Sequence, residues 1–196
     1  MNWKGVIMEY TKSCLPITDI CLNVTEECNL ACRYCFTEHH PNYMTIDVAK
    51  DTVKWLLENA KIASEIKKET ITPNVGFFGG EPTLMWDSII VPLVEWVKEN
   101  QWPVNFGITS NCVLMDKEKV DFLINNNIGL LLSMDGNELT QNYNRPYKKD
   151  KEIKSFDLVS KNLPYIAEKM PNTTFRSTIT QNTAQYLFDN LMFAGN

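Results

Sequence analysis

The sequence predicts an α/β protein whose parallel strands form a partial barrel. Short apolar runs alternate with segments of helical periodicity, which is typical of βα units and a parallel sheet. Several of these strands, read at period two, carry apolar residues on one face and polar or small residues on the other. The polar faces are expected to line a common interior, so we predict a TIM-like (β/α)6 partial barrel, interrupted after about five βα units.

The first two units contain the strongest boundary signals. A strand over residues 17–25 leads into a cysteine-rich loop, and Thr45 is placed to open the following helix, where apolar residues recur at helical spacing. A second strand over residues 74–78 runs into Gly79-Gly80-Glu81-Pro82, and a helix is predicted over about residues 87–100.

The remaining units show the same alternation of strand and helix. Asp116 is placed to cap the helix after the third strand, and a loop is expected after Asp135-Gly136 at the end of the fourth. The predicted strands cover residues 104–109, 128–134 and 173–180, and the predicted helices cover residues 116–126 and 153–170, followed by an incomplete last helix.

The polar faces of four strands are expected to point inward. In chain order they comprise Asn23 and Thr25; Asn105, Gly107 and Thr109; Ser133 and Asp135; and Thr174, Arg176, Thr178 and Thr180. In barrels of this kind the chemistry lies at the C-terminal ends of the strands. The cysteine-rich loop, the Gly-Gly-Glu-Pro turn, the Ser110-Asn111 pair and Asp135 all fall at such ends.

Composition excludes several classes of function. The 196 residues carry a formal net charge of −5 from interspersed signs, without a basic run that would follow phosphates, so a nucleic-acid partner is not expected. No stretch approaches the roughly 20 apolar residues of a membrane span, and charges interrupt the apolar residues near the N-terminus. We therefore expect one soluble, cytoplasmic domain without a membrane partner.

Three of the six cysteines lie within eight residues: Cys28, Cys32 and Cys35. Soft thiolate ligands favour iron–sulfur clusters, Zn²⁺ or Cu⁺. A [4Fe–4S] cluster held by three cysteines leaves one iron open to an exogenous ligand. A structural zinc site completed by Cys21, His39 or His40 uses the same residue types and is the alternative.

The spacing Cys-x₃-Cys-x₂-Cys, with Tyr34 just before the last cysteine, resembles the signature loop of the radical S-adenosylmethionine (SAM) superfamily. The resemblance implies a [4Fe–4S] cluster on Cys28, Cys32 and Cys35, whose fourth iron is completed by the amino and carboxylate groups of SAM. It also implies that residues 1–196 are the core domain of such an enzyme, without the C-terminal auxiliary-cluster domain.

The turn Gly79-Gly80-Glu81-Pro82 resembles the family segment that receives the SAM amino group. Glycines permit close approach of the backbone to a ligand, and carbonyl or carboxylate oxygens suit an ammonium group. As an isolated motif it is also an ordinary strand-terminating turn. Its position one βα unit after the cysteine loop favours the cofactor interpretation.

The same resemblance implies further residues that contact SAM. The alternative is that these residues are ordinary strand-end residues. Ser133 and Asp135 are similar to the fourth-strand contacts of the SAM carboxylate and ribose, and Ser110 and Asn111 to a third-strand segment near the ribose or substrate. A guanidinium fork suits a carboxylate, and we favour Arg145 over Arg176 for this role.

The matching segments 22–30, 78–83 and 133–136 are most similar to peptide- and protein-modifying members. The resemblance implies reductive cleavage of SAM to a 5′-deoxyadenosyl radical, which abstracts hydrogen from a peptide or protein loop, with thioether or cross-link formation as the outcome. A flavodoxin- or ferredoxin-type protein is the expected one-electron reductant. The alternatives are a sulfatase-maturating enzyme and an inactive iron–sulfur or zinc-binding module. Cys14, Cys21 and Cys112 are expected to be structural.

Overall fold

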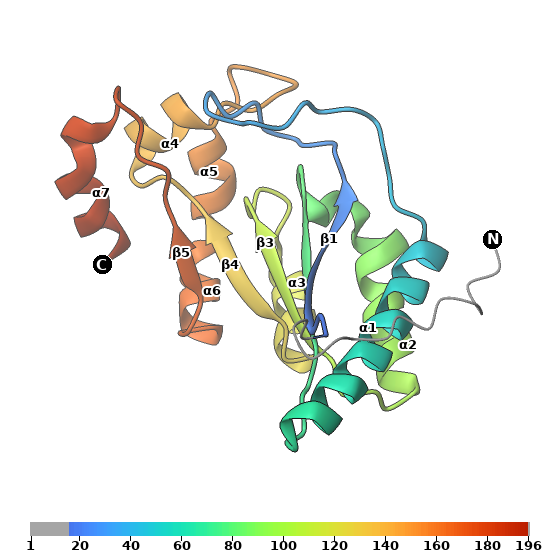
Figure 1. The fold of residues 1–196 in the computed structure, drawn as a ribbon. Helices are drawn as coiled ribbons and strands as arrows, with labels where there is room; N and C mark the ends of the chain where they lie inside the picture. The colour runs from blue at the N-terminus through green and yellow to red at the C-terminus, as the bar shows by residue number, and fades with distance from the viewer. Residues whose placement is uncertain (1–15, 196) are drawn as a thin grey trace.

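The computed structural model describes residues 16–195, which form a curved sheet of five parallel strands (Figure 1). The strands follow one another in space in the order of the chain. They are β1 Asp19–Thr25, β2 Asn74–Gly79, β3 Asn105–Ser110, β4 Gly129–Ser133 and β5 Thr174–Arg176. The α/β class and the partial barrel are thereby confirmed.

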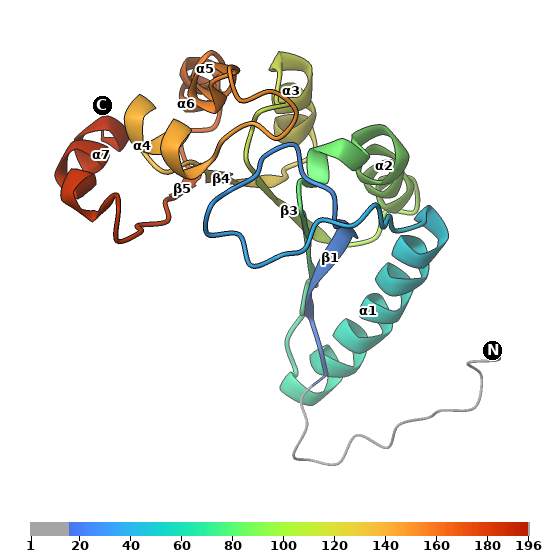
Figure 2. The ribbon, with the colours of Figure 1, turned by 90° about the horizontal axis from the view of Figure 1, so that it is seen from above.

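The helices that connect the strands cover the outer side of the sheet. Figure 2 shows α1, α2, α3 and α6 on this side, while the segment between β1 and α1 crosses above the C-terminal strand ends in Figure 1. The α-helices are α1 Ile46–Lys67, α2 Val91–Glu99, α3 Lys117–Asn125, α4 Glu138–Asn144, α5 Ser155–Ser160, α6 Leu163–Lys169 and α7 Leu187–Ala194. Short helical turns precede two of them, η2 Pro82–Met85 and η3 Trp86–Ile90 before α2 and η4 Ala184–Tyr186 before α7.

The two faces of the sheet differ as the alternation predicted. The face under the helices is buried and apolar, and it includes Leu22, Val24, Val75, Phe77, Phe106, Ile108, Leu130 and Leu132. Phe77 and Phe106 stack across β2 and β3 with ring centroids 5.6 Å apart. Burying each such side chain contributes about 1.5–3 kcal/mol, so this face anchors the sheet and leaves the concave face free for a site.

Four elements depart from the sequence prediction. The fifth strand is shorter than expected, since β5 covers only Thr174–Arg176 of the predicted residues 173–180. The helix expected over about residues 87–100 is α2, which begins at Val91, but the turns of Pro82–Met85 and Trp86–Ile90 run directly into it, so that helical structure begins at Pro82. The single helix expected over residues 153–170 is two helices, α5 and α6, and Pro164 lies in the first turn of α6. Proline lacks the backbone N–H and disfavours helical backbone before it, which explains the break. The loop expected after β4 contains α4, capped by Asn137.

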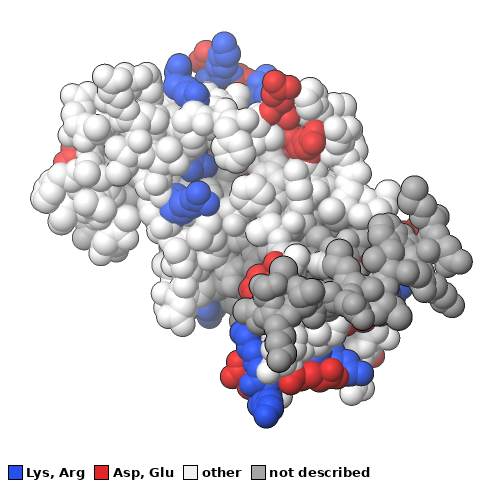
Figure 3. Space-filling view, viewed as in Figure 1, with Lys and Arg blue, Asp and Glu red and all other residues white. Residues whose placement is uncertain are grey.

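Charged residues do not form a broad patch of one sign on the face seen in Figure 3, where Lys and Arg lie beside Asp and Glu and the middle of the face is largely uncharged. Among the helices of residues 16–195, none is long and apolar enough to cross a membrane.

Candidate functional site

The cysteine loop, residues 28–35, is fixed by the last residue of α4 and the segment that follows it. The N–H groups of Ala31 and Arg33 donate to the carbonyl oxygens of Pro146 and Asn144, each at 2.9 Å. Leu30, which precedes Ala31, is fully buried and packs into the core. A chain segment more than 100 residues away therefore sets the position of the loop.

The residues just before the loop rest against the Gly-Gly-Glu turn at the end of β2. The N–H groups of Gly80 and Glu81 donate to the carbonyl oxygens of Thr25 and Glu27, both at 2.8 Å. A Cβ atom on Gly80 would lie 2.2 Å from the Glu27 carbonyl oxygen, and Gly79 has a φ of +143°. The glycines thus permit close approach of two backbone segments of the protein itself, which aligns the turn with the cysteines.

A cavity of about 340 Å³ lies between these segments and the ends of β3 and β4. Its size is in the range of small-molecule sites. The structure brings most of the predicted site residues to its lining: Cys28, Cys32, Tyr34, Cys35, Gly79, Gly80, Glu81, Ser110, Asn111, Ser133 and Arg145. Arg176 and Thr178 line it as well, whereas Pro82 and Asp135 are not among its lining residues.

The Glu81 carboxylate is buried and faces four donors of the chain. One oxygen accepts from the Thr83 N–H at 3.1 Å, the Thr83 hydroxyl at 2.5 Å and the Ser110 hydroxyl at 2.8 Å, and the other accepts from the Asn111 N–H at 2.8 Å. Burial raises the pKa of Glu81, and these hydrogen bonds oppose the rise. Glu81 therefore ties the end of β2 to the end of β3.

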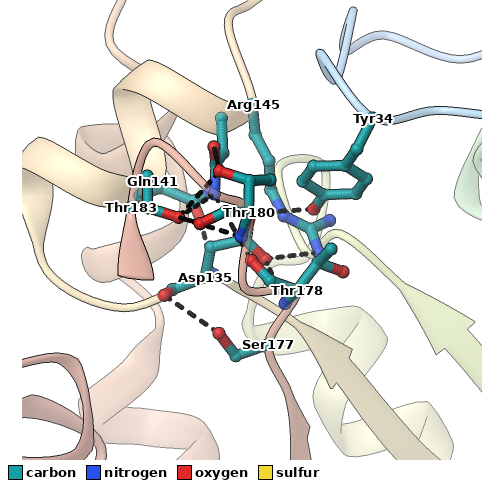
Figure 4. Close-up of polar contacts among 9 residues, drawn as sticks. Tyr34, Asp135, Gln141, Arg145, Ser177, Thr178, Thr180 and Thr183 are labelled. Carbon is teal, nitrogen blue, oxygen red and sulfur yellow. Dashed lines mark hydrogen bonds and ion pairs between the residues drawn. The ribbon is translucent and has the colours of Figure 1, made fainter. Parts of the chain in front are cut away.

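Asp135 occupies the centre of a second buried network (Figure 4). Its carboxylate accepts from the Arg145 guanidinium at 2.9 Å, from the Tyr34 hydroxyl at 2.8 Å and from the Thr178 N–H at 3.0 Å. Asp135 and the Arg145 side chain are 0% and 8% exposed. The network joins the cysteine loop to the ends of β4 and β5, and it fixes the Arg145 guanidinium beside the cavity.

The three loop thiols differ in exposure. Burial is the main cause that raises the pKa of Cys28 to about 12 and of Cys32 to about 11, whereas Cys35 is exposed. The Cys35 Sγ lies 3.6 Å from the His39 Nε2. Without a metal, Cys28 and Cys32 are protonated at neutral pH, so thiolate formation at these positions has to be coupled to metal binding.

The remaining cysteines are not alike. Cys112 is buried against the core, as expected of a structural residue, whereas Cys21 is exposed on the concave face of β1, against expectation. Cys21 is the third residue of β1 and alternates with the buried Leu22, which explains its exposure. Cys14 lies outside the described residues.

Sequence reasoning missed several residues of the site. Asn29, within the cysteine loop, is buried and accepts from the Asn111 side-chain amide at 2.8 Å. Phe36 and Thr37 line the cavity after the last loop cysteine, together with His39, which the sequence offered only as a zinc ligand, and Thr178 binds Asp135. The only signal for Asn29, Phe36 and Thr37 was their nearness to the cysteines, and Thr178 was expected on an inward face without a partner.

Comparison with known proteins identifies a matching family and similar relatives. The family model described as the Radical SAM superfamily matches residues 22–180. The chain is 27% identical over 197 residues to the radical SAM cyclopropyl synthase TigE of Paramaledivibacter caminithermalis, a match that covers 92% of this chain and 39% of that protein.

Two solved structures have a similar fold. Native anSMEcpe with bound AdoMet and the Cp18Cys peptide superposes with a TM-score of 0.71 at 23% identity, covering 92% of this chain and 48% of that one. Streptococcus suis SuiB bound to the precursor peptide SuiA gives a TM-score of 0.64 at 18% identity, covering 92% and 37%. The chain thus spans less than half the length of each of these relatives. The match over residues 22–180, together with the partial barrel, shows that this chain belongs to the radical SAM superfamily.

Proposed function

We propose that this chain holds a [4Fe–4S] cluster on Cys28, Cys32 and Cys35 and binds SAM in the adjoining cavity. The observation that carries the proposal is the meeting of the three thiols with the Gly79–Glu81 turn around one cavity of about 340 Å³. Family membership supports the same two cofactors. When bound, they supply one-electron cleavage of SAM and an adenosyl radical that abstracts hydrogen.

Two buried donors support the fit of these groups. Among residues 16–195, Arg145 Nε and Asn29 Nδ2 are buried and lack a hydrogen-bond partner. Unpaired buried donors are costly and call for a ligand. The SAM carboxylate would satisfy Arg145, and a negatively charged cluster would suit the Asn29 amide beside Cys28.

The zinc alternative differs from the cluster in what the thiols would bind. A structural zinc ion takes four ligands at about 2.0–2.3 Å from a single centre, whereas the thiolates of a [4Fe–4S] cluster each bind a different iron. Metal analysis of the reconstituted chain separates the two, since one zinc per chain without iron would favour the alternative.

The remaining site residues take roles that follow from their contacts. Three of the four donors to Glu81 share one carboxylate oxygen, and the other oxygen accepts only from the Asn111 N–H. Each carboxylate oxygen has about two acceptor sites, so we assign the SAM amino group to the free site on this second oxygen and to the backbone carbonyls of the turn. Ser133 lines the cavity and would contact SAM directly. The other candidates act as supports: Tyr34 and Asp135 orient Arg145, Ser110 and Asn111 hold the cavity wall, and Pro82 opens the turn η2.

A peptide or protein loop is the proposed hydrogen donor. A second cavity of about 330 Å³ shares Phe78 and Thr109 with the first and continues along the concave face of the sheet. Gly76, Gly107 and Gly129 stand in register there and leave room beside the proposed SAM site. The peptide-bound structures of anSMEcpe and SuiB support this substrate class, with thioether or related cross-link formation as the proposed outcome.

The test is anaerobic reduction of the iron-loaded protein with dithionite in the presence of SAM. We expect methionine and 5′-deoxyadenosine, and a loss of two hydrogens by mass in a peptide encoded beside the gene. A Ser133→Ala variant should bind SAM more weakly while keeping its iron. Iron-loaded protein that neither binds nor cleaves SAM would contradict the cofactor proposal, and turnover of a free small molecule without change in any such peptide would contradict the substrate proposal.

A further inference from the structure

We propose that Asn111 is a positioning residue that sets the reduction potential of the cluster through a hydrogen bond to the Cys28 sulfur. The inference rests on the proposed function, since it requires a cluster on the loop. Its basis is the contact of the Asn111 Nδ2 with the Cys28 Sγ at 3.8 Å, within reach of a weak sulfur acceptor.

Cys28 has more donors than the other loop cysteines. The Leu30 N–H donates to the Cys28 Sγ at 3.4 Å, in addition to the Asn111 amide. Among the described residues, no such pair of donors faces Cys32, and the Cys35 Sγ lies 3.6 Å from the half-buried His39 Nε2 and donates to the Thr37 carbonyl at 3.9 Å. One of the three irons would therefore be bound through a thiolate with two hydrogen bonds.

The Asn111 side chain is held firmly enough for this role. The residue is 5% exposed, and its Oδ1 accepts from the Val113 N–H at 3.0 Å. Its backbone N–H donates to Glu81 at 2.8 Å, and its Nδ2 also donates to the Asn29 Oδ1 at 2.8 Å. With the oxygen committed to Val113, the orientation of the amide is fixed and the nitrogen faces the sulfur.

The direction of the effect follows from charge. Reduction adds an electron to a cluster whose charge is partly carried by its thiolates, and a donor on sulfur stabilises this more negative state. Partners of metal ligands both orient the ligand and tune the metal. Removing the Asn111 donor should therefore shift the cluster to a more negative potential.

The experiment is an EPR-monitored redox titration of the iron-loaded chain and its variants without SAM. In Asn111→Val we expect the equilibrium constant for one-electron reduction to fall by up to about tenfold, which corresponds to a shift of about 59 mV. Asn111→Asp keeps the acceptor for Val113, removes the donor and adds a negative charge beside the cluster, so it should shift the potential further in the same direction than Asn111→Val. Asn59→Ala, on α1, removes another buried asparagine whose amide donates to the Trp55 carbonyl, and it should leave the potential unchanged.

A measurement on protein with an intact Asn111 tests the hydrogen bond to Cys28 even if the Asn111 variants fail to take up iron. With ¹⁵N at the asparagine side-chain amides, pulsed EPR of the reduced cluster should reveal a nitrogen coupling that persists in Asn29→Ser, which removes the other nearby label but keeps an oxygen acceptor. Absence of any such coupling, or equal potentials in wild type and Asn111→Val, would overturn the inference. Failure of the wild-type chain to assemble a cluster would instead overturn the proposed function.

Discussion

The Asp135 network makes a quantitative prediction about stability. Asp135→Ala leaves the Arg145 guanidinium buried without its counter-charge and removes the acceptor of Tyr34 and Thr178. Breaking a buried pair by removing one partner costs about 3–5 kcal/mol. For a chain of this size each kcal/mol lowers the melting temperature by about 2–4 °C, so we expect a decrease of roughly 6–20 °C.

Urea unfolding followed by circular dichroism measures this loss. Glu138→Ala is the matched control, because it breaks an ion pair of 2.6 Å with Lys154 in which the two side chains are 52% and 56% exposed. Exposed pairs contribute about 0.2–1 kcal/mol. The double variant Asp135→Leu/Arg145→Met should recover much of the stability, since it removes both charges. A cost for Asp135→Ala no larger than that of the control would refute the role of the network.

Three further predictions concern single residues. Cys32→Ala should abolish cluster assembly, whereas Cys112→Ala, in a buried residue outside the loop, should leave the iron content unchanged by colorimetric analysis. Gly80→Ala should cost about 1–3 kcal/mol by urea unfolding and impair iron uptake, because its Cβ meets the Glu27 carbonyl at 2.2 Å; Gly107→Ala, whose nearest contact is at 3.7 Å, should be tolerated. Burial acts to raise the pKa of the helix cap Asp116, but hydrogen bonds from Lys119 outweigh it and lower this pKa below 3.8. A lowered pKa stabilises the fold above pH 3.8 and the contribution is lost as pH falls through the folded value, so the cost of Asp116→Ala, about 1 kcal/mol at pH 7, should diminish in acid.

The order of strands and helices could be predicted because each apolar run is local. Leu22 and Ile108 alternate with polar or small neighbours, and this pattern directs them under the helices. Phe77 and Leu132 each have one apolar neighbour, Phe78 and Leu131, so their strands were recognised as short apolar runs. The helix α4 was missed because its segment is mostly polar and lacks apolar periodicity. The break between α5 and α6 had a visible signal, Pro164, which the prediction of one long helix overrode.

The candidate site was only partly predictable, since the sequence identifies the residues but not their partners. The spacing of the cysteines and the Gly-Gly-Glu turn are local features. By contrast, Asp135 meets Tyr34 across 101 residues and Thr178 across 43, and no local pattern encodes these contacts. The same holds for Glu81 and Asn111, which are 30 residues apart.

The most direct test of the account is metal and sulfide analysis of the anaerobically reconstituted chain, combined with EPR of the reduced protein before and after SAM is added. The account predicts about four iron and four sulfide per chain and a spectrum that changes when SAM binds the open iron. One zinc per chain without iron, or an iron–sulfur spectrum that SAM leaves unaltered, would contradict it.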